Sequence, residues 1–325
     1  MTKWSVIVGL AMALGWLVPV PVIGQTETSR SDGRSVPRTP DGKPDIQGVW
    51  SFATITPLER PNEVGESERF TEEEAAARDE DARTRNDRPP RAASTGTYNS
   101  FWWDRGDTLP NRRTSLIVDP PDGKLPPLTP TGQTREDTLS ARGFASWQDR
   151  SLWERCVQRG GVPRLPSGYN NNLQILQSGD YVVILYEMIH ESRIIPLDGQ
   201  PHVSDTIRQY QGDARARWDD DTLVVETTNF TDQTHLTFSG VHHSDGLRVV
   251  ERFTRTDADE LLYEFTIDDP STWTRAWTAA LPMPKSDGRI YEYACHEGNY
   301  GMANLLSGAR TEEETAAGAQ QTGLR

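Results

Sequence analysis

The sequence predicts a mainly β fold, an antiparallel meander that closes into a barrel. The first observation is a series of short segments with alternating apolar side chains that follows residue 172. The second is that turn sequences such as SGD, LDG and KSDG join most of these segments, as is typical of hairpins. No long helical pattern separates them, which excludes a doubly wound parallel sheet. A meander leaves two open edges, and closure into a barrel removes both.

Residues 1–24 have the pattern of a secretory signal peptide. Lys3 precedes an apolar run from Val6 to Val20, which is shorter than the roughly 20 residues that a membrane-spanning helix needs. No second apolar run of that length follows, so we expect a secreted or periplasmic protein without a transmembrane span. Residues 25–44 are polar and aperiodic, and are predicted to be a flexible leader.

Residues 45–310 are predicted to form a single β-barrel domain. Its first strand covers residues 46–52, where apolar side chains alternate with polar or small ones. Residues 60–165 are predicted to be a long insertion of loops and helix. Residues 311–325 are expected to be a disordered tail.

The insertion contains one clear helix start. Thr71 and Glu74 form a capping box, and the polar sequence after them predicts a short surface helix that ends near Thr84. Residues 87–114 are irregular but rich in aromatic and arginine side chains. Long ordered loops are usually lids or binding loops, so we expect this segment to be packed down or to bind something.

Two further elements are predicted in the insertion. Residues 115–118 are expected to pair with residues 124 and 125 across a DPPDG turn. Residues 147–157 are expected to form one or two helical turns before a glycine-rich break.

Nine segments after residue 172 are predicted to be strands. The clearest alternation of apolar and polar side chains runs from Leu261 to Asp268. The full set is Leu173–Gln177, Tyr181–His190, Arg193–Pro196, Arg215–Trp218, Thr222–Thr228, Leu247–Arg255, Leu261–Asp268, Trp273–Leu281 and Ile290–Ala294.

Composition excludes one class of partner. The formal net charge is −14, whereas nucleic-acid binding depends on clustered lysine and arginine side chains that face phosphates. We therefore expect no nucleic-acid partner. An acidic surface that keeps the protein soluble is the simplest explanation of the charge.

Two cysteines, Cys156 and Cys295, occur in the whole chain. An exported protein meets an oxidising environment, so a disulfide between them is the preferred interpretation. The alternative is a thiol nucleophile at Cys295 beside His296. Neighbouring residues on a strand point to opposite faces, which argues against that alternative.

The segment from Tyr186 to Arg193 places titratable groups in an otherwise apolar strand, where burying them without partners would be unfavourable. In the structural interpretation, Glu187 is buried and paired with an arginine. In the functional interpretation, Glu187 or His190 faces a cavity. The candidate catalytic residues are His190 and His296 as bases, and Glu187, Glu297 or Tyr169 as acid partners.

Two segments are rich in side chains that both donate and accept hydrogen bonds. If they lie together at one barrel mouth, they form a polar rim on which tryptophans supply stacking surfaces for a sugar or an aromatic ligand. The candidate ligand-binding residues are Tyr169, Asn170, Asn172, Asn299, Tyr300, Trp102, Trp103 and Trp273. The alternative is that the asparagines only form turns.

Charged residues within the predicted strands have a simpler interpretation. We expect them to form outward-facing ion pairs. They are Glu226, Glu251, Arg252, Glu264 and Arg275.

A metal site is the lesser alternative. His190, His202 and His296 with Glu297 are ligand types that suit zinc or iron. No local His-x-His or HExxH spacing supports such a site, so no cofactor is predicted. The sequence also lacks a GxSxG elbow, a Walker loop, a GxGxxG motif and an EF-hand loop.

Two resemblances to known families add to the prediction of a secreted β-barrel. The Gly48-Val49-Trp50 motif resembles the Gly-x-Trp motif on the first strand of lipocalin-like (calycin) barrels, in which the tryptophan plugs the closed end and an arginine packs over it. The blocks PDIQGVW, YNNN, EMIHESRIIPLDGQPH, DTLVVETTNFTD and YEYACHEGNY resemble an uncharacterised family of secreted proteins from environmental bacteria. That resemblance implies one ordered unit and carries over no catalytic residue.

Three function hypotheses follow. The leading one is a secreted protein that binds a small organic ligand, such as a glycoside, terpenoid or aromatic compound, in a barrel cavity. The second is a lyase, hydratase or hydrolase that uses His and Glu acid–base chemistry on the same barrel. The third is an envelope-associated structural protein.

Overall fold

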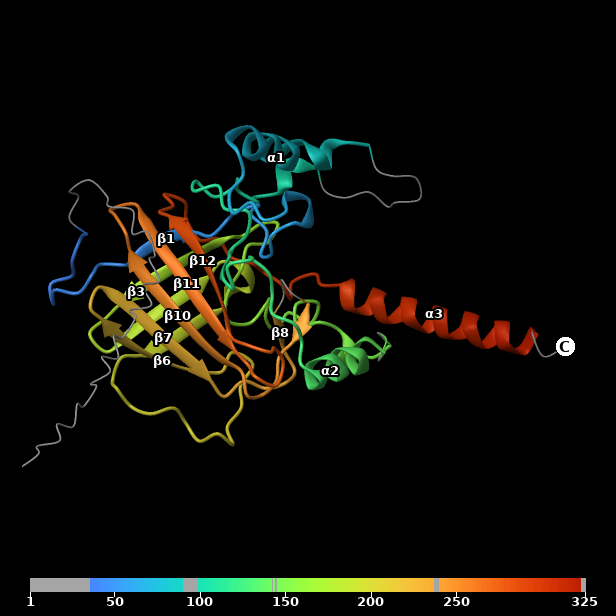
Figure 1. The fold of residues 1–325 in the computed structure, drawn as a ribbon. Coiled ribbons are helices and arrows are strands. Elements are labelled where there is room, and N and C mark those ends of the chain that lie inside the picture. Colours follow the sequence, from blue (N-terminus) through green and yellow to red (C-terminus); the bar gives the residue numbers. More distant parts are fainter. Residues whose placement is uncertain (1–35, 90–98, 142, 144, 237–239, 323–325) are drawn as a thin grey trace, which may run out of the picture. The chain divides into compact units, whose positions relative to one another are not determined.

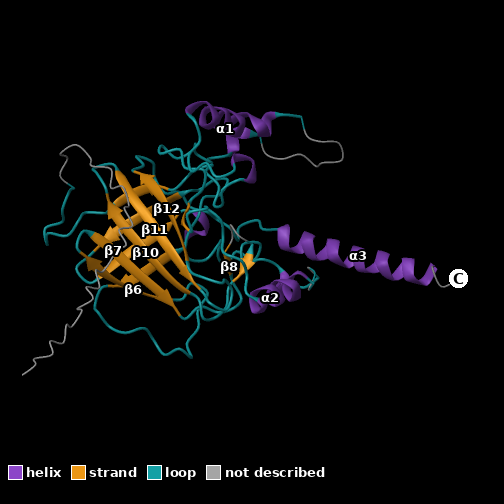
Figure 2. Ribbon diagram, in the orientation of Figure 1, coloured by secondary structure: helices purple, strands orange, loops and turns teal. Residues whose placement is uncertain are grey.

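The computed structural model describes residues 36–89, 99–141, 143, 145–236 and 240–322 (Figure 1). The predicted signal peptide and most of the predicted leader lie outside the described residues. The described residues belong to one unit that begins at Arg34. This unit consists mainly of antiparallel sheets, and the described part of the chain also contains three α-helices (Figure 2). The mainly β fold is therefore confirmed.

The smaller sheet has four antiparallel strands in the order β1-β3-β4-β5. Their bounds are β1 Gly48–Ser51, β3 Asn172–Gln177, β4 Tyr181–Tyr186 and β5 Ser192–Pro196. Trp50 lies opposite Leu173 and is completely buried. Its indole nitrogen donates a hydrogen bond to the Ile46 carbonyl at 2.9 Å, so this large side chain is buried without leaving its polar atom unsatisfied.

The larger sheet has six antiparallel strands in the order β2-β12-β11-β10-β7-β6. Their bounds are β2 Ile117–Asp119, β6 Asp213–Asp219, β7 Thr222–Thr228, β10 Arg248–Arg255, β11 Glu260–Asp268 and β12 Trp277–Pro284. A separate pair, β8 His235–Leu236 and β9 Val241–His242, completes the strands. Burial alternates along β11 as the sequence predicts.

The two sheets share one hydrophobic core. Trp273, predicted as a stacking surface for a ligand, is instead 1% exposed within that core and packs edge-on against Trp277. At one side of the sheets, the amide of Ser286 donates to the Val49 carbonyl at 2.8 Å, which brings β1 beside the end of β12. At the other side β5 lies next to β6. The described strands nevertheless form separate sheets, without the continuous ladder of a closed barrel.

The helices carry recognisable start signals. Helix α1, Glu72–Thr84, begins with the predicted capping box of Thr71 and Glu74. Helix α2 is Pro130–Ser140 and α3 is Gly301–Thr322. The 3-10 helices are η1 Asn62–Val64, η2 Arg85–Asp87, η3 Ser100–Trp102, η4 Trp147–Asp149 and η5 Met188–His190. In the described residues no helix is long and apolar enough to cross a membrane.

Several predicted strands end early or pair differently. The strand predicted to reach His190 ends at Tyr186, because Ile189 and His190 adopt positive φ angles of 63° and 54° inside η5. These residues therefore do not alternate between two faces. Residues 290–294 form no strand. Strand β2 pairs with β12, and not with residues 124 and 125.

Two helical segments also differ from the expectation. Helix α2 is absent from the predicted elements, although Thr129 caps it and Pro130 occupies its first turn, both of which are start signals. Its polar sequence has no apolar stripe to reveal it. Residues 311–322, where a disordered tail was expected, form the second half of α3. The alanines and glutamates of this segment have high helix propensity.

Candidate functional site

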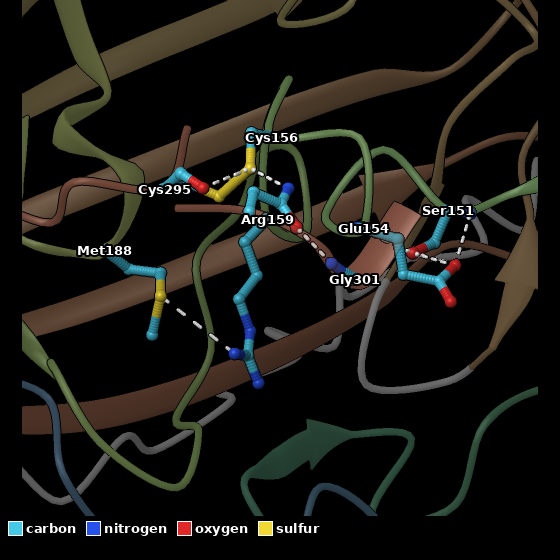
Figure 3. The surroundings of a disulfide bond; sticks show 8 residues. Ser151, Glu154, Cys156, Arg159, Met188, Cys295 and Gly301 are labelled. Carbon is cyan, nitrogen blue, oxygen red and sulfur yellow. Dashed lines mark hydrogen bonds between the residues drawn. A yellow bond between two sulfur atoms is a disulfide. The ribbon is translucent and has the colours of Figure 1, made fainter. Parts of the chain in front are cut away.

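The predicted disulfide between Cys156 and Cys295 is present (Figure 3). It joins the irregular chain before β3 to the irregular chain after β12, across 139 residues of sequence. Both cysteines are consumed in it, so the thiol-nucleophile alternative at Cys295 is wrong. Arg159 extends from the same segment towards Met188, with Nη1 at 4.0 Å from the sulfur (Figure 3).

Glu187 and Asn172 come together beside this disulfide-linked segment. The Asn172 amide donates to Oε2 of Glu187 at 2.8 Å, and the Tyr291 backbone amide lies 3.5 Å from Oε1. Glu187 is 4% exposed. Its partners in the described residues are amide groups and not the arginine that the structural interpretation expected.

His190 contacts the same C-terminal segment. The backbone amide of Tyr293 donates to Nδ1 of His190 at 3.1 Å. Nδ1 therefore accepts a hydrogen bond, which places the proton of a neutral imidazole on Nε2. Glu187 and His190 both help to hold residues 291–293 against the end of β4.

Tyr169 and Trp103 form the aromatic part of this region. Their ring centroids are 5.9 Å apart. The Arg159 guanidinium lies 4.0 Å from the Trp153 ring and 5.8 Å from the Tyr169 ring. Burial and the neighbouring Tyr293 raise the pKa of Tyr169, so its hydroxyl remains protonated at neutral pH.

The other predicted site residues lie elsewhere on the surface. Trp102 is 62% exposed and contacts Phe101 edge-on. Tyr300 is 77% exposed at the start of α3. Asn170 occupies a left-handed turn with φ of 55°. The Asn299 side chain lies 3.3 Å from the Cys156 sulfur, while His296 and Glu297 are exposed in the loop between the disulfide and α3.

Asn171, which the sequence analysis did not single out, joins two loops of the site. It is completely buried. Its side-chain amide donates to the carbonyls of Asp104 and Ser167, and its side-chain oxygen accepts from the Ser167 amide. This one side chain therefore fixes the loop that carries Trp103 against the loop that carries Ser167 and Gly168. Its position in an asparagine run was the available signal.

A groove of about 610 Å³ lies between α1 and these two loops. Trp103, Arg105, Ser167 and Gly168 line one side, and residues of α1 line the other. Gly168 is required there, because a Cβ atom at this position would overlap the indole ring of Trp103. Trp103 also contacts Tyr169, which lies outside the lining of the groove.

The ionic side chains of the groove fall into two sets. Arg78 pairs with Glu63, and Asp81 pairs with Arg88. Arg85 and Arg105 have no acidic partner among the described residues. The Arg105 guanidinium lies 3.9 Å from the centroid of the Trp103 ring. Burial and the positive charge of Arg85 lower the pKa of Arg105.

A second cluster of arginines lies between the sheets, and there the chain supplies the carboxylates. Arg193 on β5 makes a two-point contact with Glu251 on β10, at 3.1 and 2.7 Å. The Tyr263 hydroxyl donates to the same carboxylate at 2.7 Å. Arg164 lies over the Tyr186 ring and pairs with Glu191, and burial lowers the pKa of Arg164 to about 10.

This buried cluster corrects one expectation. Glu251 was expected to face outward, but it is 0% exposed. Val249, Glu251, Phe253 and Arg255 alternate as the buried positions of β10. The phase of that alternation in the sequence was the signal that Glu251 points inward.

A second hollow, of about 1150 Å³, borders α2 and η4. Several of its ionic side chains have partners within the chain. Glu136 pairs with His242, and Arg135 donates to Thr272 at 2.8 Å. Arg155 lies 5.0 Å from the Trp147 ring. Arg135 and Arg155 thus have partners that are not carboxylates.

The described residues contain no group of three or more His, Cys, Asp and Glu side chains arranged to hold a metal ion. His202, one of the possible metal ligands, contacts Asp213 at 2.8 Å. In comparisons with family models and with curated proteins, the chain matches none of them.

Proposed function

We propose that this protein works outside the cytoplasm and binds a small organic molecule with a flat, aromatic part in the groove at α1. The observation that carries the proposal is the position of Trp103, which lines a 610 Å³ groove and is held by Gly168 and Asn171. Cavities of a few hundred Å³ with a fixed aromatic wall suit small organic ligands. The signal-like segment and the disulfide support the location.

The proposal places the ligand beside the barrel, and not inside it. The approach of β1 to β12 and of β5 to β6 supports a lipocalin-like barrel with two open seams. Between the sheets, however, Trp50, Trp277 and Phe265 are buried together with the Arg193–Glu251 pair. These side chains occupy the space that an interior ligand would need.

The test is native mass spectrometry of protein purified from its own secretory compartment, before and after denaturation. We expect an organic mass to be released from the wild type and from Trp147→Ala, and to be absent from Trp103→Ala. Trp147 is the matched control, since it also has an arginine over its ring, but it lines the other hollow. Release of the same mass from Trp103→Ala would refute the proposal.

A second candidate, acid–base catalysis, is favoured by one observation. Desolvation and the negative charge of Glu187 raise the pKa of Asp104, and a carboxyl group whose pKa is raised by burial beside a second carboxylate is typical of a general acid. Asp104 directly follows Trp103 in the chain, and Tyr169 contacts the Trp103 ring. Turnover of an aryl glycoside that Asp104→Asn abolishes would support an enzyme, and turnover unchanged in that variant would exclude this pair.

A further inference from the structure

We propose that the groove at α1 recognises an aromatic acid, whose oxyanion group binds between Arg85 and Arg105 while its ring stacks at Trp103. This inference rests on the proposed function and specifies its ligand class. The oxyanion is a carboxylate or a phosphate ester, because both present the paired oxygens that a guanidinium binds.

The first argument is the balance of charges in the groove. Arg78 and Asp81 are paired with residues of the chain, and the Glu74 carboxylate accepts a hydrogen bond from the Thr71 amide at 2.8 Å. After these contacts Arg85 and Arg105 remain without a carboxylate among the described residues. Both side chains line the groove, and the positive charge of Arg85 acts on Arg105, so an anion bound between them would offset that repulsion.

The second argument is that acidic side chains are abundant in this protein. The chain has 48 Asp and Glu residues against 34 Lys and Arg residues. On α1 itself, Arg83 contacts both Glu80 and Asp107. Arg85 and Arg105, which both line the groove, have no such partner among the described residues, so an anionic ligand would supply the negative charge that the acidic chain does not supply there.

The third argument is geometric. The Arg105 guanidinium lies 3.9 Å from the Trp103 ring centroid, a distance typical of cation–π contact. Stacking on the indole limits the orientations of the guanidinium, so less freedom is lost when it binds an anion. A ligand that carries an aromatic ring next to an oxyanion can contact both groups of this stacked pair.

The experiment compares matched probes by isothermal titration calorimetry at low salt. The probes are 2-naphthoate, 2-naphthyl phosphate and the neutral 2-naphthamide. A hydrogen-bonded ion pair is stronger than its neutral counterpart, so we expect one of the two anions to bind about tenfold more tightly than the amide. The tighter anion identifies the oxyanion. Added sodium chloride should weaken binding of the anion and leave binding of the amide unchanged.

Variants separate the two parts of the recognition. Arg85→Gln and Arg105→Gln should each reduce the anion-to-amide preference towards one. Arg83→Gln should keep the preference for the anion. Arg83 lies in the last turn of α1, two residues before Arg85, but it already pairs with Asp107. Trp103→Ala should weaken both probes by a similar factor. Thermal denaturation of Arg85→Gln, Arg105→Gln and Trp103→Ala checks that each variant remains folded.

Three results would overturn the inference in distinguishable ways. If the amide binds as tightly as both anions and Trp103→Ala weakens it, the oxyanion site is wrong while the proposed function stands. If the preference survives in Arg85→Gln and Arg105→Gln, the anion binds elsewhere and the inference is wrong. If no probe binds the wild type at about 1 mM, both proposals are wrong.

Discussion

Two sets of arginines in this protein have opposite surroundings. Arg193, between the sheets, is 5% exposed and makes a two-point contact with a carboxylate of the same chain. Arg85 and Arg105 both line the groove at α1 and have no acidic partner in the described residues. The contrast concerns where the counter-charge comes from: the fold itself supplies the carboxylate for Arg193, whereas we propose that a ligand supplies the anion for Arg85 and Arg105.

The largest expected effect is the loss of the buried carboxylate. Glu251→Gln should lower the free energy of unfolding by about 3–5 kcal/mol, because Arg193 would then be buried without a counter-charge. Urea denaturation followed by circular dichroism measures this. Asp219→Asn is the control, since that carboxylate pairs with Arg252 on the surface and should cost no more than about 1 kcal/mol. Equal effects of the two substitutions would contradict the structural role of the buried pair.

The next largest effect on the free energy of unfolding is expected from loss of the Tyr263 hydroxyl, which donates to Glu251. Tyr263→Phe removes a hydrogen bond to an ionised group and should lower stability by about 1.5–3 kcal/mol at neutral pH. Burial and the charge of Glu251 raise the pKa of Tyr263 well above its ordinary value. In the unfolded chain the phenol ionises near pH 10, so the wild type should lose stability as the pH rises above that value.

The phenylalanine variant should lose less stability over the same alkaline range. Denaturation midpoints between pH 7 and 11 measure the difference. The same alkaline slope in wild type and variant would show that Tyr263 is not the group responsible.

A smaller effect is expected at the start of α1. Thr71→Ala removes the side-chain acceptor of the capping box and should cost about 1 kcal/mol. Arg85 directly follows α1, so fraying of the helix should also weaken anion binding in the groove. Thr129→Ala, which removes the cap of α2, is the control for stability without an effect on the groove. Identical probe affinities in both cap variants would show that α1 does not position Arg85.

The smallest effect separates the two arginine sets directly. Arg105→Gln should lower the free energy of unfolding by no more than about 1 kcal/mol, because it removes the contact with the Trp103 ring but no ion pair within the chain. Arg193→Gln should destabilise the protein severely, since Glu251 would lose its counter-charge. Both are measured by thermal and chemical denaturation. Comparable losses of stability in the two variants would show that Arg105, like Arg193, is needed for the stability of the fold.

Much of the fold follows from local patterns. Alternation along residues 261–268, the capping box at Thr71 and the turn sequences predict β11, α1 and most hairpins correctly. Helix α2 was not predicted, because its polar sequence has no apolar stripe. The turn at Ile189 and His190 was not predicted because a β-branched residue such as Ile189 rarely adopts a positive φ angle.

The site was harder to predict than the fold. The sequence places Glu187 and Asn172 among the candidates, and the structure brings them into contact. Arg85 and Arg105 were not candidates, because the sequence does not show which acidic side chains from distant segments will lie beside an arginine. The structure shows that both arginines line one groove, where α1 meets the loop of Trp103.

The disulfide has a consequence for how the chain withstands proteolysis. Strands β3 to β12 all lie between Cys156 and Cys295, so they belong to one covalent ring. A single protease cut in an exposed loop of that ring, such as the one around Asp205, leaves both fragments tied together. The nicked protein would run as one chain until a reductant is added, and the core strands could remain paired. Strands β1 and β2 lie outside the ring, so a cut between β2 and Cys156 would leave them without a covalent link to it, held by backbone pairing and by buried side chains such as Trp50.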